Sequence, residues 1–120
     1  MRKWVVTRCH RLGQACQGLR WAWSREVHLR IHGVAMLAWV GVGWWVQWDL
    51  WSWAILGTGF ALVGGAELFN TAMERMVDAW CMDPSPVAKV IKDVSAGAVL
   101  WVVVMVTIVA CLLLYRQVVA

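Results

Sequence analysis

The run VSAGAVLWVVVMVTIVACLLLY, residues 94–115, decides the fold class of this chain. It contains no Asp, Glu, Lys or Arg, and a helix that crosses a bilayer needs roughly 20 mostly apolar residues. Two shorter uncharged runs precede it, at residues 31–48 and 50–66, and helix-forming residues follow the second one past Glu67. We therefore predict three transmembrane helices, at residues 31–48, 50–70 and 94–115.

The composition also indicates an all-α membrane protein. Of the 120 residues, 62% are hydrophobic and 15% charged, whereas an average soluble domain is about 45–50% apolar and about 25% charged. Disorder, a collagen-like chain and a disulfide scaffold are excluded, because large apolar residues are abundant, glycine numbers only 10 and the four cysteines are scattered. A chain of this length forms a single domain, residues 1–120.

Basic residues gather at two places along the chain. Most of the 11 lysines and arginines precede residue 31, and Lys89 and Lys92 lie before the third span, whereas the hairpin around Asp49 has none. The positive-inside rule therefore places the N-terminus and the second connection in the cytoplasm. A basic arm beside apolar spans favours anionic lipid headgroups as its partner, not nucleic acid. The hairpin tryptophans are expected to form an aromatic belt at the opposite interface: Trp44, Trp45, Trp48, Trp51 and Trp53.

Residues 1–30 form a basic arm with a helical pattern. On a helical wheel its apolar side chains share one face, opposite the basic and polar ones: Leu12, Ala15, Cys16, Leu19 and Trp23. This pattern predicts an amphipathic helix that lies in the membrane interface. Glu26 falls on the apolar side, where a carboxylate needs a partner, and Arg30, four residues further on, is one candidate.

A stripe of polar side chains follows the second predicted span. At 100° per residue, Glu67, Asn70, Glu74 and Asp78 fall within an arc of about 80° on one helix face. Burial of an ionised carboxylate in lipid is costly, so we expect this stripe to line a polar site and not to face the bilayer.

A second polar cluster lies in residues 71–93, which we expect to form a cytoplasmic extension and a loop. Ser85 is a good N-cap with Pro86 at the first helical position, so a new helix is predicted to run from there into the third span. Lys89, Lys92 and Asp93 occupy its first turns, where cations and free backbone N–H groups suit a phosphate. Together with the carboxylates nearby, this cluster favours Mg²⁺ bridging phosphates.

Two weaker patterns have simpler interpretations. His28 and His32 are spaced i, i+4, which can bind zinc, but no third ligand is evident, so interfacial histidines are expected. Gly57, Ala61 and Gly65 form a row of small residues that favours close helix packing.

The polar motifs resemble those of the bacterial integral-membrane diacylglycerol kinase and undecaprenol kinase family. The first is Glu67-x-x-Asn70-Thr71-Ala72-x-Glu74-x-x-Val77-Asp78, and the second is Ala88-Lys89-x-x-Lys92-Asp93. The resemblance continues upstream through Glu26-x-x-x-Arg30-Ile31-His32 and covers about residues 12–115.

This resemblance implies a homotrimer in the bacterial plasma (inner) membrane. Each multi-pass subunit would have three transmembrane helices and an amphipathic surface helix, and the active sites would lie between subunits at the cytoplasmic face. The implied reaction is transfer of the γ-phosphate of MgATP to the hydroxyl of a membrane lipid alcohol, in phospholipid or lipid-carrier recycling.

The resemblance also implies roles for single residues. Glu67 matches the catalytic base, and Glu26 and Glu74 match carboxylates that bind the metal ion, Mg²⁺, and the nucleotide. Asn70 and Asp78 match further polar residues of the site. The remaining positions matched to nucleotide binding are Lys92, Asp93, Asp83 and Gln14.

Two other functions are compatible with a small membrane protein. A proton-coupled multidrug transporter depends on a membrane glutamate, but it needs four spans and a glutamate near mid-bilayer, whereas we count three spans with carboxylates at one end. A non-catalytic lipid-binding adaptor would use only the basic arm. Within the kinase interpretation, both diacylglycerol and undecaprenol stay open as acceptors.

Overall fold

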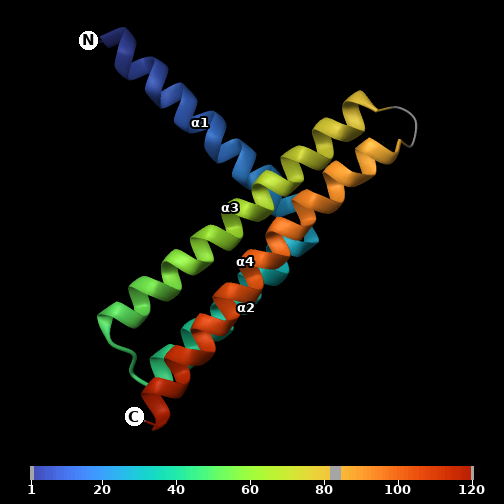
Figure 1. Ribbon diagram of the computed structural model, residues 1–120. Helices are drawn as coiled ribbons and strands as arrows, with labels where there is room; N and C mark the ends of the chain where they lie inside the picture. The colour runs from blue at the N-terminus through green and yellow to red at the C-terminus, as the bar shows by residue number, and fades with distance from the viewer. Residues whose placement is uncertain (1, 82–84, 120) are drawn as a thin grey trace.

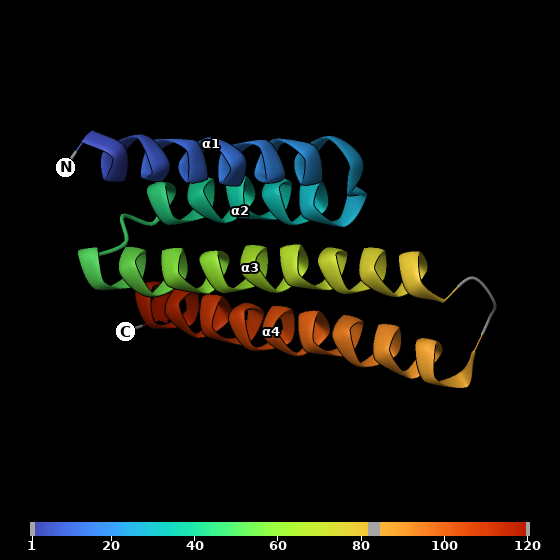
Figure 2. The same ribbon diagram turned by 90° about the horizontal axis from the view of Figure 1, so that it is seen from above.

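Four helices make up the chain in the computed structural model, which describes residues 2–81 and 85–119, with side chains from His10 onward. They are α1 (Arg2–Arg25), α2 (Val27–Trp45), α3 (Leu50–Trp80) and α4 (Pro86–Val119), and no strand occurs within these ranges. α3 and α4 lie side by side and antiparallel in both views, and α2 runs along them (Figures 1 and 2). α1 projects away from the other three helices (Figure 1). The predicted all-α architecture is confirmed.

Among the described helices, α3 and α4 are long and apolar enough to cross a membrane. α2 does not meet the same length and hydropathy test. The reason lies in its first turns, where His28, Arg30 and His32 precede the apolar part of the helix. The first predicted span, residues 31–48, therefore corresponds to a helix that starts polar and ends at Trp45.

The helix ends explain how the polar residues are positioned. α3 continues unbroken to Trp80, so the whole stripe from Glu67 to Asp78 lies on one helix. α4 begins at Pro86, and the Ser85 hydroxyl accepts a hydrogen bond from the Ala88 backbone N–H at 3.0 Å, which confirms the predicted N-cap. The amphipathic helix ends earlier than residue 30: Glu26 has extended backbone angles and separates α1 from α2.

A tryptophan cluster forms the core at the end of the bundle opposite the polar stripe. Trp48 is only 5% exposed, stacks on Trp39 and meets the Trp53 ring edge-on, with ring centroids 6.3 Å and 5.7 Å away. A Cβ at Gly43 would lie 2.2 Å from the Trp48 ring, so this close approach requires glycine. The expectation that Trp48 belongs to an aromatic belt is therefore wrong, because the turn folds its ring back onto α2 and α3. Trp44, Trp45 and Trp51 are exposed, as membrane anchors would be.

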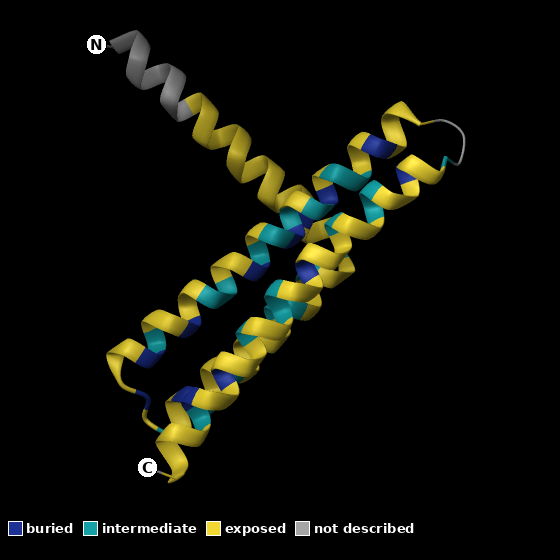
Figure 3. Cartoon of the chain, viewed as in Figure 1, coloured by how far each residue is buried: buried dark blue, intermediate teal, exposed yellow. Residues whose placement is uncertain are grey.

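Few residues of the bundle are buried (Figure 3). Many of the exposed residues have large apolar side chains. The buried side chains of α3 lie on one face, which packs against the other helices: Ser52, Leu56, Val63, Glu67, Thr71 and Val77. Gly57, Ala61 and Gly65 fall on the opposite face, where the first and last have open space around them. This surface suits contact with lipid or with further copies of the chain.

Candidate active site

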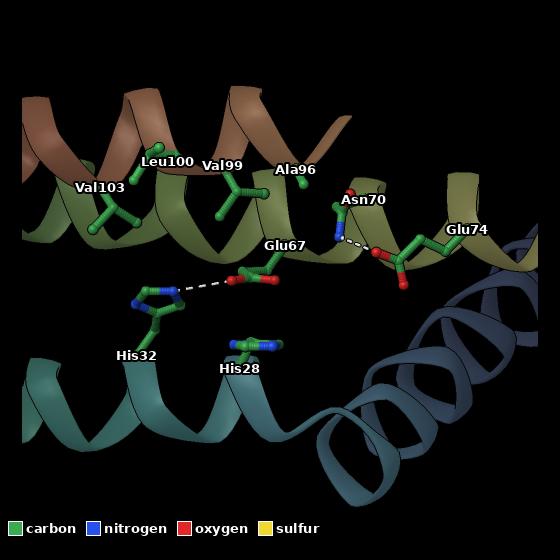
Figure 4. Close-up of a pocket in the computed structure, with 9 residues that line it drawn as sticks. All are labelled: His28, His32, Glu67, Asn70, Glu74, Ala96, Val99, Leu100 and Val103. Carbon is green, nitrogen blue, oxygen red and sulfur yellow. Dashed lines mark hydrogen bonds and ion pairs between the residues drawn. The ribbon is translucent and has the colours of Figure 1, made fainter. Parts of the chain in front are cut away.

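Glu67 is a carboxylate on the buried face of α3. It is 6% exposed and occupies the same helix face as Val63, Leu56 and the other core residues of α3. Its side chain points toward α2, where it lies close to His28 and His32 (Figure 4). The Glu67 Oε1 to His32 Nε2 distance is 2.9 Å. A carboxylate in a core position is costly unless it is paired, so the histidine accounts for how the helix tolerates it.

Asn70 and Glu74 continue the site along α3, one and two turns beyond Glu67. The Asn70 side-chain amide donates to Glu74 Oε1 at 3.0 Å, and the Asn70 carbonyl oxygen accepts a bond from the Ser95 hydroxyl of α4 at 2.7 Å. Asn70 is thus fixed from both sides. It holds the Glu74 carboxylate in place and ties α3 to α4 beside the cavity.

A cavity of about 350 Å³ opens among these side chains. Three helices line it: α2 and α3 contribute polar groups, and α4 contributes an apolar wall (Figure 4). The lining residues are His28, His32, Glu67, Asn70, Glu74, Ala96, Val99, Leu100 and Val103. A second, apolar cavity of about 360 Å³ lies between α2 and α3 and shares His32 with the first. A polar group can therefore meet Glu67 while an attached apolar chain stays in an apolar environment.

The residues matched to nucleotide binding lie further along the bundle. Lys92 forms an ion pair with Asp78 between α4 and α3, and Asp93 forms one with Lys89 within α4. Neither Lys92 nor Asp93 lines the cavity around Glu67. The polar side chains therefore follow one another along successive turns of α3, from the buried Glu67 to the exposed Asp78.

Gln14 and Glu26 do not line this cavity either. Gln14 is exposed on α1, and Asp83 lies outside the described residues. Glu26 faces Arg75 of α3, whose Nη2 lies 3.2 Å from Glu26 Oε1. The suggestion that Arg30 partners Glu26 is not supported, because Arg75 of the neighbouring helix occupies the carboxylate instead.

A metal ion would have carboxylates available here, but not a complete set of protein ligands. Among the described residues, no three His, Cys, Asp or Glu side chains converge on one point. Mg²⁺ needs only one or two carboxylates when phosphate oxygens and water supply its other ligands. The Glu74 carboxylate at the cavity fits this requirement.

Sequence reasoning missed three residues of this site. His28 and His32 were expected at the interface, yet both line the cavity, and Ser95 bonds to Asn70. The i, i+4 spacing of the two histidines does place them on one face of α2. The residue that His32 contacts, Glu67, lies on α3. Ser95 carries no local pattern that would single it out.

Comparisons with known proteins agree on one family. A family model described as prokaryotic diacylglycerol kinase matches residues 13–114. The diacylglycerol kinases of Escherichia coli (strain K12) and Shigella flexneri are each 32% identical over 105 residues, which cover 88% of this chain and 86% of theirs. The undecaprenol kinase of Bacillus subtilis (strain 168) is 37% identical over 83 residues, or 66% of this chain and 65% of that protein.

Proposed function

The chain belongs to the prokaryotic diacylglycerol kinase family and is a lipid kinase of the diacylglycerol/undecaprenol kinase type; we propose that its reaction takes place in the cavity around Glu67. The acceptor is the hydroxyl of a membrane lipid alcohol, and the donor is MgATP. The main support for placing the reaction in this cavity is the buried Glu67 carboxylate, which lies where a polar and an apolar cavity meet.

Glu67 acts as the general base on the lipid hydroxyl. Oε1 is held by His32, and among the described residues no hydrogen bond reaches Oε2, which leaves that oxygen for the hydroxyl proton. The apolar cavity beside His32 accommodates the first part of the lipid chain. An amphipathic substrate is thereby oriented with its hydroxyl toward the carboxylate.

The phosphate groups of ATP lie beside the turns of α3 that follow Glu67. Glu74 lies about 10 Å from Glu67 along the axis of α3, and Asp78 about 16 Å, at 1.5 Å per residue. Lys92 pairs with Asp78 near the end of α3 and can turn its ammonium group to a phosphate oxygen. Asp93 and Gln14 would contact the nucleotide from the outer side.

Mg²⁺ would be held by the Glu74 carboxylate, with Glu26 as the second carboxylate. When bound, the ion offsets the negative charge of the phosphate oxygens, which is where most of the acceleration of phosphoryl transfer comes from. Asn70 prepares Glu74 for this because it fixes the orientation of one carboxylate oxygen. Glu26 becomes available when Arg75 releases it.

The active protein is a homotrimer with the catalytic cavity at the cytoplasmic side. The row of Gly57, Ala61 and Gly65 supports this, since it faces away from the subunit core and allows close approach of another helix. The basic residues of α1 and α4 support a cytoplasmic N-terminus and α3–α4 connection. In this orientation the bundle has three spans, α2, α3 and α4.

Transfer of radiolabelled γ-phosphate from ATP tests the proposal. The purified protein in lipid bilayers should phosphorylate diacylglycerol or undecaprenol, offered together so that their relative rates are measured in one reaction. Glu67→Gln should lower the rate with both acceptors by at least a hundredfold, because general-base catalysis typically contributes 10²–10⁴-fold. Near-normal transfer by Glu67→Gln would show that another group accepts the proton.

A further inference from the structure

The His32–Glu67 contact joins two helices at the proposed base. His32 lies in α2, Glu67 in α3, and their side chains approach to 2.9 Å. Building on the proposed function, we propose that His32 is a positioning residue for the phosphoryl transfer, which orients the Glu67 carboxylate. His32 does not touch the reacting atoms itself.

The chemistry of the pair fixes which atom carries the proton. An ionised carboxylate has no proton to donate, so any hydrogen bond between these two atoms is donated by the Nε2–H of His32. The neutral imidazole then has its proton on Nε2, and Nδ1 is left as an acceptor. With Oε1 engaged, the Glu67 carboxylate cannot rotate freely, and Oε2 is presented to the cavity.

Burial makes this single contact important. The Glu67 side chain is 8% exposed and that of His32 is 25% exposed. Within the described residues, His32 is the partner that reaches the Glu67 carboxylate from another helix. A buried carboxylate that loses its donor bears the desolvation cost alone, so it turns toward water or takes up a proton. Either response removes a base from the cavity.

The groups around His32 leave it as the partner of the proposed base. The ionisable side chains that line the same cavity are His28 from α2 and Glu67 and Glu74 from α3, whereas α4 contributes only uncharged residues there and α1 contributes the Trp23 ring to the adjoining cavity. Of the two histidines in this cavity, His32 is the one that pairs with Glu67.

Two substitutions at His32 separate the polar contact from side-chain bulk. Gln places an amide nitrogen at the same number of bonds from the backbone as Nε2, so His32→Gln keeps an N–H donor, whereas His32→Leu removes the donor. His10→Gln on the exposed part of α1 is the matched control. Each variant, with Glu67→Gln and the double variant His32→Leu/Glu67→Gln, is assayed for kcat and for the KM of ATP in bilayers.

We expect His32→Leu to lower kcat roughly tenfold to hundredfold, the range that a misplaced catalytic group produces, with the KM of ATP within about twofold. His32→Gln should stay within about fivefold of the unmodified enzyme, because its amide nitrogen can take the place of Nε2. The double variant should be no slower than Glu67→Gln, because His32 acts only through Glu67. His10→Gln should match the unmodified enzyme in both kinetic constants.

Several results would overturn the inference. Unchanged kcat in His32→Leu, an additive loss in the double variant, or a His32→Gln variant as slow as His32→Leu would each show that His32 does not act through the base. If His32→Leu fails to assemble, His32→Ala and its double variant with Glu67→Gln take its place. A normal rate in Glu67→Gln would instead remove Glu67 as the proposed base, so the two failures are distinguishable.

Discussion

Arg75 of α3 reaches Glu26 at the junction of α1 and α2, with Nη2 3.2 Å from Oε1, although the two residues are 49 positions apart in the sequence. The same guanidinium lies over the Trp21 ring of α1, 5.2 Å from its centroid. One side chain therefore ties the surface helix to α3. It also occupies a carboxylate that the proposed reaction needs for its metal ion.

Arg75→Gln should loosen the attachment of α1. The exposed ion pair and the cation–π contact are each worth up to about 1 kcal/mol, so their joint loss should speed amide exchange in residues 18–25 by up to roughly thirtyfold. Hydrogen–deuterium exchange in lipid nanodiscs measures this, with Arg30→Gln as the matched control on α2. Unchanged protection of α1 in Arg75→Gln would show that the helix is held by other contacts.

Glu74→Gln should weaken the dependence on Mg²⁺ more than it disturbs the fold. Glutamine can still accept the Asn70 hydrogen bond, but it lacks the charge that holds a divalent cation. The half-saturating Mg²⁺ concentration should rise at least tenfold, since even indirect changes at metal sites often cost 10–100-fold in affinity. Asp49→Asn, at the far end of the bundle, is the control. An identical Mg²⁺ titration for Glu74→Gln would take this residue out of the metal site.

Ala61→Leu should weaken the oligomer while leaving the subunit fold intact. Ala61 is exposed on the face of α3 away from the core, so added bulk there affects packing between copies, at an expected cost of about 1–3 kcal/mol. Light scattering on the detergent-solubilised protein should find smaller species than for the unmodified chain. Ala38→Leu on α2 should retain the original size. A fully retained trimer in Ala61→Leu would mean that the small-residue row is not the interface.

Asp49 should stabilise the fold only while its carboxylate is ionised. Hydrogen bonds from the side chain and backbone N–H of Ser52 lower the pKa of Asp49 below its ordinary value of 3.8. Desolvation opposes them in part, and the nearby Arg116 lowers the pKa further. A lowered pKa in the folded state stabilises the fold above 3.8, and this contribution is lost as the pH falls through the lowered pKa. Near neutral pH, Asp49→Asn should unfold at a lower temperature than the unmodified protein.

The difference in unfolding temperature between the two proteins should shrink as the pH falls below 3.8. Arg116→Gln should lower the unfolding temperature by less, because the Asp49 carboxylate still accepts the N-cap hydrogen bond from the Ser52 backbone N–H. A gap that stays constant down to the lowest pH tested would contradict a stabilising role for the ionised carboxylate.

Much of the fold follows from local patterns. The uncharged run from 94 to 115 and the Ser85-Pro86 start signal predict α4, and the observed helix joins the two. The spacing of Glu67, Asn70 and Glu74 predicts a common helix face, and all three line one cavity. The family motifs predict the kinase activity, which the comparisons confirm, and the transporter alternative finds no support in them.

Other features depend on contacts between distant residues, and their prediction was incomplete or wrong. Trp48 lies among several tryptophans at the end of a predicted span, as interfacial tryptophans do, yet the turn buries it against Trp39 and Trp53. Glu26 has a possible partner four residues away, yet Arg75 reaches it from α3. The family motifs contain both Glu67 and His32, but nothing in them indicates that the two side chains meet.

The sequence by itself determined the helices, their apolar character and the polar stripe on α3, because helix formation and hydrophobic periodicity depend on residues only a few positions apart. Only the tertiary structure decided which group meets which: His32 with Glu67, Ser95 with Asn70, and Arg75 with Glu26. These pairs depend on the rotation and offset of one helix against another. That arrangement is set by side-chain packing along the whole contact, which no short segment contains.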